Sequence, residues 1–122
     1  MRNDATYLDV IAECIEAIDR YLATAGDVPV REVLRVDGLI RDGVVRRLEV
    51  LCDATGKLTP ELRGRYPSIP WARITDFRNV LVHAYLDVDP DRVADVVLGS
   101  LPDLRRAVDA ERGRSRRGHL FE

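Results

Sequence analysis

The sequence contains little cysteine, and this limits the kinds of site it can build. Cys14 and Cys52 are the only cysteines among the 122 residues, and each falls within a pattern typical of an amphipathic helix. We expect two buried thiols, with a disulfide or a ligand as the alternative. There is no paired-cysteine motif and no pair of histidines at helical spacing, so we expect no zinc site and no cofactor.

Long hydrophobic runs are also missing. No apolar stretch approaches the roughly 20 residues that a helix needs to cross a bilayer. The first residues, Met-Arg-Asn-Asp, are polar and lead into an amphipathic pattern, so we expect no secretory signal, no membrane contact and a cytoplasmic protein. A hydrophobic fraction of 46% and a charged fraction of 33% are typical of a globular chain, and the length suits one domain.

The chain has no excess of positive charge. Its formal net charge is −2, which argues against a protein that binds long nucleic acid by charge alone, because such binding uses many Lys and Arg contacts to phosphate. Almost all of the cations are arginine, with Lys57 as the single lysine. Arginine suits bidentate contacts to phosphate, but a GC-rich genome enriches arginine through codon usage, so this bias decides little.

Apolar residues recur at spacings of three and four through most of the chain, which predicts helices. The expected helices cover residues 4–24, a short piece around 33–34, 37–57, 60–65, 71–86 and 90–112. Polar residues are expected to cap three of these helices at their N-termini: Asn3 or Asp4, Thr59 before Pro60, and Asp89 before Pro90. Gly43 indicates close helix packing, and Pro102 should kink or break the last helix. We predict an all-α, up-and-down bundle of four to five helices in residues 1–112, followed by a basic, flexible tail at residues 113–122.

The outer face of the predicted helix 71–86 is unusual. On a helical wheel, its apolar residues gather on one arc that should face the core: Ile74, Phe77, Val80, Leu81 and Ala84. Arg78, Asn79, His83 and Tyr85 lie elsewhere, around Val82. A solvated face would carry Glu, Lys and Gln, whereas an apolar residue among such polar groups suits a surface that a second molecule covers.

Arg78 and His83 lie about 140° apart on this wheel, so within one helix they do not converge on one small atom. Two copies of the helix crossing at a two-fold axis would bring both sets into one cleft. We therefore expect a homodimer that forms through this helix and shares its site.

The segment from Arg78 to Tyr85, Arg-Asn-Val-Leu-Val-His-Ala-Tyr, resembles the signature of HEPN ribonucleases. It is most similar to that of the HepT toxins that are paired with minimal nucleotidyltransferase antitoxins. That motif is Arg, four residues, His, one residue and Tyr, usually with a polar residue after the Arg, and every position matches. The similarity covers about residues 4–108. One departure is Cys52-Asp53-Ala54, where the family often has Gly-Glu-Ala, so the carboxylate here is shorter.

The resemblance implies a HEPN bundle and a toxin-like, metal-independent endoribonuclease. In such enzymes the 2′-hydroxyl of RNA attacks the neighbouring phosphate and leaves a 2′,3′-cyclic phosphate. It implies that His83 is the general base or acid, that Arg78 stabilises the phosphate, and that Asn79 orients the phosphate or His83. Tyr85 is implied as the residue that an MntA-like nucleotidyltransferase antitoxin adenylylates, which would block the cleft beside Arg78.

Each of these residues also has a plainer interpretation. His83 could be structural or a surface residue, Arg78 could pair with Asp76 or with an acid on another helix, Asn79 could bond to the backbone, and Tyr85 could be a dimer contact. The basic run near the C-terminal end could touch RNA or only be solvated. The alternative function is a non-catalytic HEPN dimer that serves as a scaffold or substrate-binding subunit for a nucleotidyltransferase.

Overall fold

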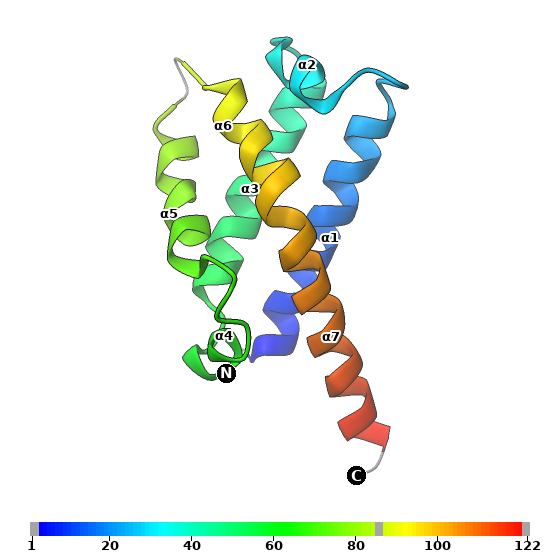
Figure 1. The fold of residues 1–122 in the computed structure, drawn as a ribbon, viewed down its shortest axis with the longest axis vertical. Helices are drawn as coiled ribbons and strands as arrows, with labels where there is room; N and C mark the ends of the chain where they lie inside the picture. The colour runs from blue at the N-terminus through cyan, green and yellow to red at the C-terminus, as the bar shows by residue number, and fades with distance from the viewer. Residues whose placement is uncertain (1–2, 85–86, 121–122) are drawn as a thin grey trace.

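The computed structural model describes residues 3–84 and 87–120, and the chain is helical through most of them (Figure 1). Its elements are α1 Asp4–Ala23, α2 Val30–Arg35, α3 Leu39–Gly56, α4 Pro60–Gly64, α5 Trp71–Val82, α6 Pro90–Asp95, the π-helical turn η1 Val96–Ser100 and α7 Leu101–Leu120. No strand occurs within the described ranges. The predicted all-α fold is confirmed.

Four long helical segments build the bundle: α1, α3, α5 and the continuous run of α6, η1 and α7. α3 packs against α1 on one side and against α5 on the other, and α7 packs along α1 (Figure 1). The core between them is aliphatic, and its fully buried members include Ile11, Ile18, Leu48, Leu51 and Leu104. None of the helices described is long and apolar enough to span a membrane.

Side-chain caps begin several of these helices where the sequence predicts them. The Asn3 side chain accepts from the backbone N–H of Thr6 at 3.4 Å, and the Thr59 hydroxyl accepts from Leu62 at 3.3 Å. These contacts satisfy backbone donors that have no partner inside the helix. Asp4 does not cap α1 but accepts from the backbone and hydroxyl of Thr59, at 2.9 and 2.7 Å, which ties the start of α1 to α4.

Two helix ends differ from the prediction. α5 stops at Val82 instead of residue 86, because the next residues turn through a short-range bond from the Ala84 N–H to the Leu81 carbonyl. Residues 85–86 lie outside the described part. α7 continues through residues 113–120, which were expected to fray; the backbone there stays helical although the sequence shows no apolar stripe.

The predicted disturbance at Pro102 takes the form of η1, directly before it. Within this turn the Leu101 N–H donates to the Val96 carbonyl, five residues earlier. In an α-helix it would donate to the carbonyl four residues earlier. Proline has no N–H for the carbonyl four residues earlier, and a π turn is one way for a helix to absorb such a break. The long C-terminal helix therefore continues past the proline.

Buried small and sulfur-bearing residues also behave as predicted. The Tyr21 ring lies against Gly43, where a Cβ would come within 3.0 Å of it, so the expected close packing is confirmed. Cys14 and Cys52 are free and buried. Burial raises the pKa of Cys52 to about 12, so this thiol stays protonated and unreactive.

Candidate active site

His83 lies at the C-terminal end of α5, where it is the C-cap residue and its ring is exposed. Its Nδ1 is 2.8 Å from the carbonyl oxygen of Asn79, which also accepts from the His83 backbone N–H at 3.2 Å. A carbonyl oxygen can only accept, so Nδ1 must carry the hydrogen. The hydrogen bond therefore fixes the ring and leaves Nε2 as the nitrogen that can exchange a proton.

Arg78 lies on the same helix and faces solvent, with 46% of its side chain exposed. Its Nε is 3.6 Å from Oδ1 of Asp53 on α3, whose side chain is 55% exposed. An ion pair this open is screened by water and adds little stability, so the guanidinium can still take a phosphate. The acid beside Arg78 thus comes from another helix, as one alternative foresaw, and no pair with Asp76 forms among the described residues.

Asp53 was missed as a member of this site. The sequence singles it out only as a departure from the family pattern, at Cys52-Asp53-Ala54. Its position beside Arg78 depends on how α3 packs against α5, where the hydroxyls of Thr55 and Thr75 lie 3.1 Å apart. The departure from the motif was the available signal, and the structure gives it a location.

The other predicted residues are placed as follows. Asn79 is exposed, and its backbone carbonyl, not its amide, contacts His83. Val82 is 40% exposed, as one of five large apolar side chains exposed within the described residues, together with Val28, Val36, Leu39 and Leu98. Arg78 and His83 share no hydrogen bond within the described residues, and each contacts a different partner, Asp53 and the Asn79 carbonyl. Tyr85 lies outside the described residues.

Over the part of the chain that the structure describes, no three His, Cys, Asp or Glu side chains gather in a way that could hold a metal ion. The groups at the site are one imidazole, one guanidinium, one amide and one carboxylate. Such a set can bind an anion and move protons.

Comparison with known proteins assigns the family. The model described as HepT-like, "Ribonuclease HepT-like", matches residues 11–111, which contain α3, α5 and His83. The chain belongs to the HepT-like ribonuclease family. The predicted resemblance is therefore confirmed.

Several curated proteins are similar to this HepT-like chain. A probable ribonuclease HepT of Thermococcus cleftensis is 30% identical over 108 residues, which cover 85% of the chain and 91% of that protein. A putative RNase of Caldanaerobacter subterraneus subsp. tengcongensis is 27% identical over 109 residues, 88% of the chain and 93% of that protein.

A third relative is longer than the HepT-like chain. It is the gamma-glutamylcyclotransferase and putative RNase of Methanocaldococcus jannaschii, which is 30% identical over 109 residues. The match covers 88% of the chain but only 47% of that protein, so the chain spans about half of its length. No solved structure matches the HepT-like chain significantly.

Proposed function

We propose that this HepT-like protein is a toxin-type, metal-independent endoribonuclease in which His83 and Arg78 cleave RNA. The observation that carries the proposal is the fixed ring of His83, whose Nδ1 is held by the Asn79 carbonyl at 2.8 Å while Nε2 remains open. Membership in a ribonuclease family and the names of its relatives support the same class of substrate.

The chemistry needs only a proton carrier and a cation. A neutral His83 imidazole takes the proton of the 2′-hydroxyl, the 2′-oxygen bonds to the adjacent phosphorus, and the bond to the 5′-oxygen breaks. A protonated imidazole returns a proton to the departing 5′-oxygen, so the products are a 2′,3′-cyclic phosphate and a 5′-hydroxyl. Arg78 stabilises the added negative charge on the phosphate oxygens, and Asn79 helps to hold the phosphate.

We also propose that the active unit is a homodimer built on the exposed face of α5. Arg78 and His83 lie about 140° apart on the helical wheel, and Val82, which lies between them on that wheel, exposes 40% of its surface. An isologous contact across a two-fold axis covers this valine twice and places the Arg78 of one copy near the His83 of the other. Each of the two sites then holds one Arg78 and one His83, and the His83 that took the proton of the 2′-hydroxyl returns it to the departing 5′-oxygen.

The proposed regulator is an MntA-like nucleotidyltransferase antitoxin that adenylylates Tyr85. This residue follows His83 by two positions, so an attached AMP adds a bulky anion beside the proposed cleft. Intact-mass measurement after co-expression with the antitoxin should show a gain of whole AMP units, and Tyr85→Phe should prevent it. An AMP gain that persists in Tyr85→Phe excludes this residue as the acceptor.

The ribonuclease proposal is tested with purified protein and labelled RNA in the presence of EDTA. We expect cleavage that leaves 2′,3′-cyclic phosphate ends, no cleavage of DNA of the same sequence, and loss of activity in His83→Ala and Arg78→Ala. His119→Ala is the matched control, because it removes the only other histidine. Full activity of His83→Ala would overturn the assignment. If the wild type cleaves no RNA and binds the nucleotidyltransferase as well as His83→Ala does, the scaffold alternative holds.

A further inference from the structure

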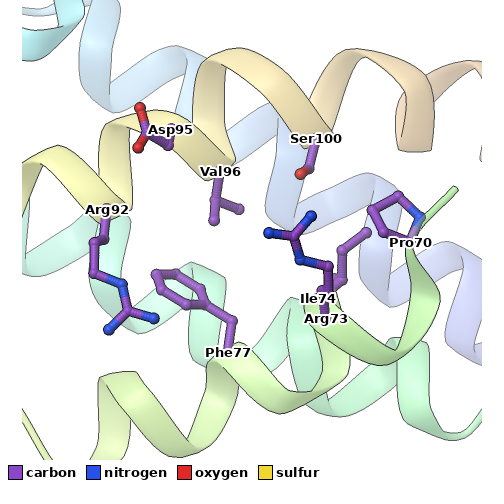
Figure 2. A pocket seen from close by; sticks show the side chains of 8 residues that line it. All are labelled: Pro70, Arg73, Ile74, Phe77, Arg92, Asp95, Val96 and Ser100. Carbon is purple, nitrogen blue, oxygen red and sulfur yellow. The ribbon is translucent and has the colours of Figure 1, made fainter.

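A groove lies between α5 and the α6–η1 segment, N-terminal along α5 to the site just described (Figure 2). Its volume is about 340 Å³. The apolar lining includes Ile74, Phe77 and Val96, and the polar lining includes Arg73, Arg92 and Ser100. The volume falls at the small end of the range for ligand-binding clefts, which suits one nucleotide unit and not a folded segment of protein.

Two arginines of the groove have no carboxylate partner in the part of the chain that the structure describes. Arg73 and Arg92 are exposed, and neither forms an ion pair within the described residues. Figure 2 shows the Arg73 guanidinium directed toward the η1 side of the groove and Arg92 at the other end, beside Phe77. The Arg92 guanidinium carbon lies 5.9 Å from the centre of the Phe77 ring, a cation–π contact that holds this side chain over the groove wall.

The one acid that lines the groove is already neutralised. Asp95 accepts from Arg31 of α2 at 2.6 Å, and Figure 2 shows its carboxylate turned away from Phe77. The charge left facing the groove is therefore positive. Two guanidiniums at separate points of a partly apolar groove, with the Ser100 hydroxyl nearby, match the alternation of phosphate and sugar along a nucleic acid strand.

We infer that this groove is a nucleotide subsite, in which Arg73 and Arg92 each bind a phosphate of the RNA strand flanking the linkage cut at His83. The inference rests on the proposed ribonuclease function and adds a second contact to it. Arg73 precedes His83 by ten residues, a rise of about 15 Å along a helix. The Arg73 end of the groove is thus too far to hold the phosphate that is cut, but a neighbouring nucleotide of the same strand can reach it.

The binding arm of the test uses a fluorescent single-stranded RNA of about 12 nucleotides and the His83→Ala protein, so that nothing is cleaved. Arg73→Gln and Arg92→Gln should each weaken affinity about fivefold. Each should also reduce the salt dependence of log K by about 0.7 per lost phosphate contact. Arg20→Gln is the matched control, since Arg20 is an exposed arginine of α1 and also forms no ion pair within the described residues.

The cleavage arm uses the same substitutions in the active protein. We expect a raised KM and an unchanged kcat for the long RNA. Arg73→Gln should have no effect on a dinucleotide, which cannot span from His83 to Arg73. Unchanged RNA affinity and salt slope in both variants would overturn the subsite. Unchanged RNA affinity with lost nucleotidyltransferase binding would also overturn the subsite. It would indicate that an acidic group of the nucleotidyltransferase occupies the groove. A wild type that binds RNA through these arginines but never cuts it would refute the ribonuclease proposal alone.

Discussion

The hydrogen bond that fixes His83 uses the backbone carbonyl of Asn79. The role of this carbonyl can therefore be tested apart from the role of the Asn79 side-chain amide, a distinction that the sequence does not make. Asn79→Ala removes the amide but keeps the carbonyl that accepts from Nδ1. We therefore expect the neutral His83 ring to keep its hydrogen on Nδ1 in this variant, because the acceptor is still present. Side-chain ¹⁵N shifts of His83 report the tautomer directly. A hydrogen that moves to Nε2 in Asn79→Ala would contradict the geometry, whereas lost cleavage with the same tautomer would assign the amide to the RNA.

A second prediction concerns Asp53, because its carboxylate competes with phosphate for Arg78 and also holds the guanidinium in position. Asp53→Asn should lower kcat about threefold and lower KM, since the cation is freer but less well placed. Asp53→Glu, which restores the longer acid, should return kcat to the wild-type level or above. The melting temperature should not move, because an exposed ion pair contributes less than about 1 kcal/mol.

This kcat–KM split distinguishes positioning from a merely structural role. A structural role would shift the melting temperature and leave both kinetic constants in proportion. If kcat and KM both stay unchanged in Asp53→Asn, the contact with Arg78 has no part in the reaction.

The motif alone predicted Arg78, Asn79 and His83 as site residues, because their spacing along the chain is a local property of the sequence. The Asp53 contact was beyond such reasoning, since it joins residues 25 positions apart and depends on the register between α3 and α5. The end of α5 was also misplaced. Ala84 continues the apolar pattern of the wheel, so periodicity cannot reveal that the helix stops at Val82.

The packing of α3 against α5 sets the position of the site, and Gly56 is its closest approach. A Cβ at Gly56 would lie 2.9 Å from the methyl carbon of Thr75. The backbone of Gly56 does not have a positive φ, so alanine fits the conformation and only the contact opposes it. Gly56→Ala should therefore lower the free energy of unfolding by about 1 kcal/mol, although alanine is the better helix former.

The Thr75→Ser background tests this reasoning, because serine removes the methyl and keeps the hydroxyl that lies 3.1 Å from Thr55. There Gly56→Ala should become neutral or stabilising, a coupling of about 1 kcal/mol in a double-mutant cycle. Denaturant unfolding measures all four proteins. Additive effects would mean that the helices shift apart freely.

A cluster around Glu111 fastens α7 to the segment that follows α4. Glu111 is buried, with only 5% of the residue exposed. Its carboxylate accepts hydrogen bonds from the Arg65 guanidinium at 2.9 and 2.8 Å and from the Tyr66 hydroxyl at 2.8 Å. The hydrogen bonds from Arg65 hold the pKa of Glu111 below its ordinary value against the opposing effect of burial. Glu111→Gln should lower the free energy of unfolding at pH 7 by about 2 kcal/mol.

The pH dependence follows from the direction of that shift. Because the pKa of Glu111 is depressed in the folded state, its stabilisation is complete above the ordinary carboxyl pKa and is lost as the pH falls below about 4. Thermal unfolding should therefore show a steeper acid loss in the wild type than in Glu111→Gln. Glu61→Gln is the control, since Glu61 contacts the same arginine at 3.7 Å with an exposed side chain. Parallel acid profiles for wild type and Glu111→Gln would contradict the assignment.

Most elements could be predicted because their causes are local. Apolar spacing located the long helices, and Thr59-Pro60 and Asp89-Pro90 marked the starts of α4 and α6. The form of the break near Pro102 was not predictable, since a kink and a π turn can both accommodate the missing N–H of proline. The helical backbone of residues 113–120 was missed because an arginine-rich run without an apolar stripe has no periodic signal.

In the molecule as a whole, α5 lies at the edge of the bundle, packed against α3 and open on its outer side (Figure 1). Three exposed features lie along this one helix: the face with Arg78 and His83, Val82 within that face, and the groove with Arg73. A bundle that places its chemistry on an edge helix leaves the site incomplete until a second surface closes over it. The helical wheel predicts such a shared site, because Arg78 and His83 lie about 140° apart on it, and the question is whether the two residues act within one subunit or across two.

Subunit mixing answers it. If Arg78 of one subunit works with His83 of the other, a heterodimer of Arg78→Ala and His83→Ala contains one intact pair, although each parent protein is inactive. Random exchange makes half of the dimers mixed, each with one of two sites, so activity should return to roughly a quarter of the wild-type level. Val82→Asp in both proteins is the control, because a buried carboxylate should prevent association and abolish the recovery. Mixed dimers, verified by mass, that stay inactive would place the whole reaction within one subunit.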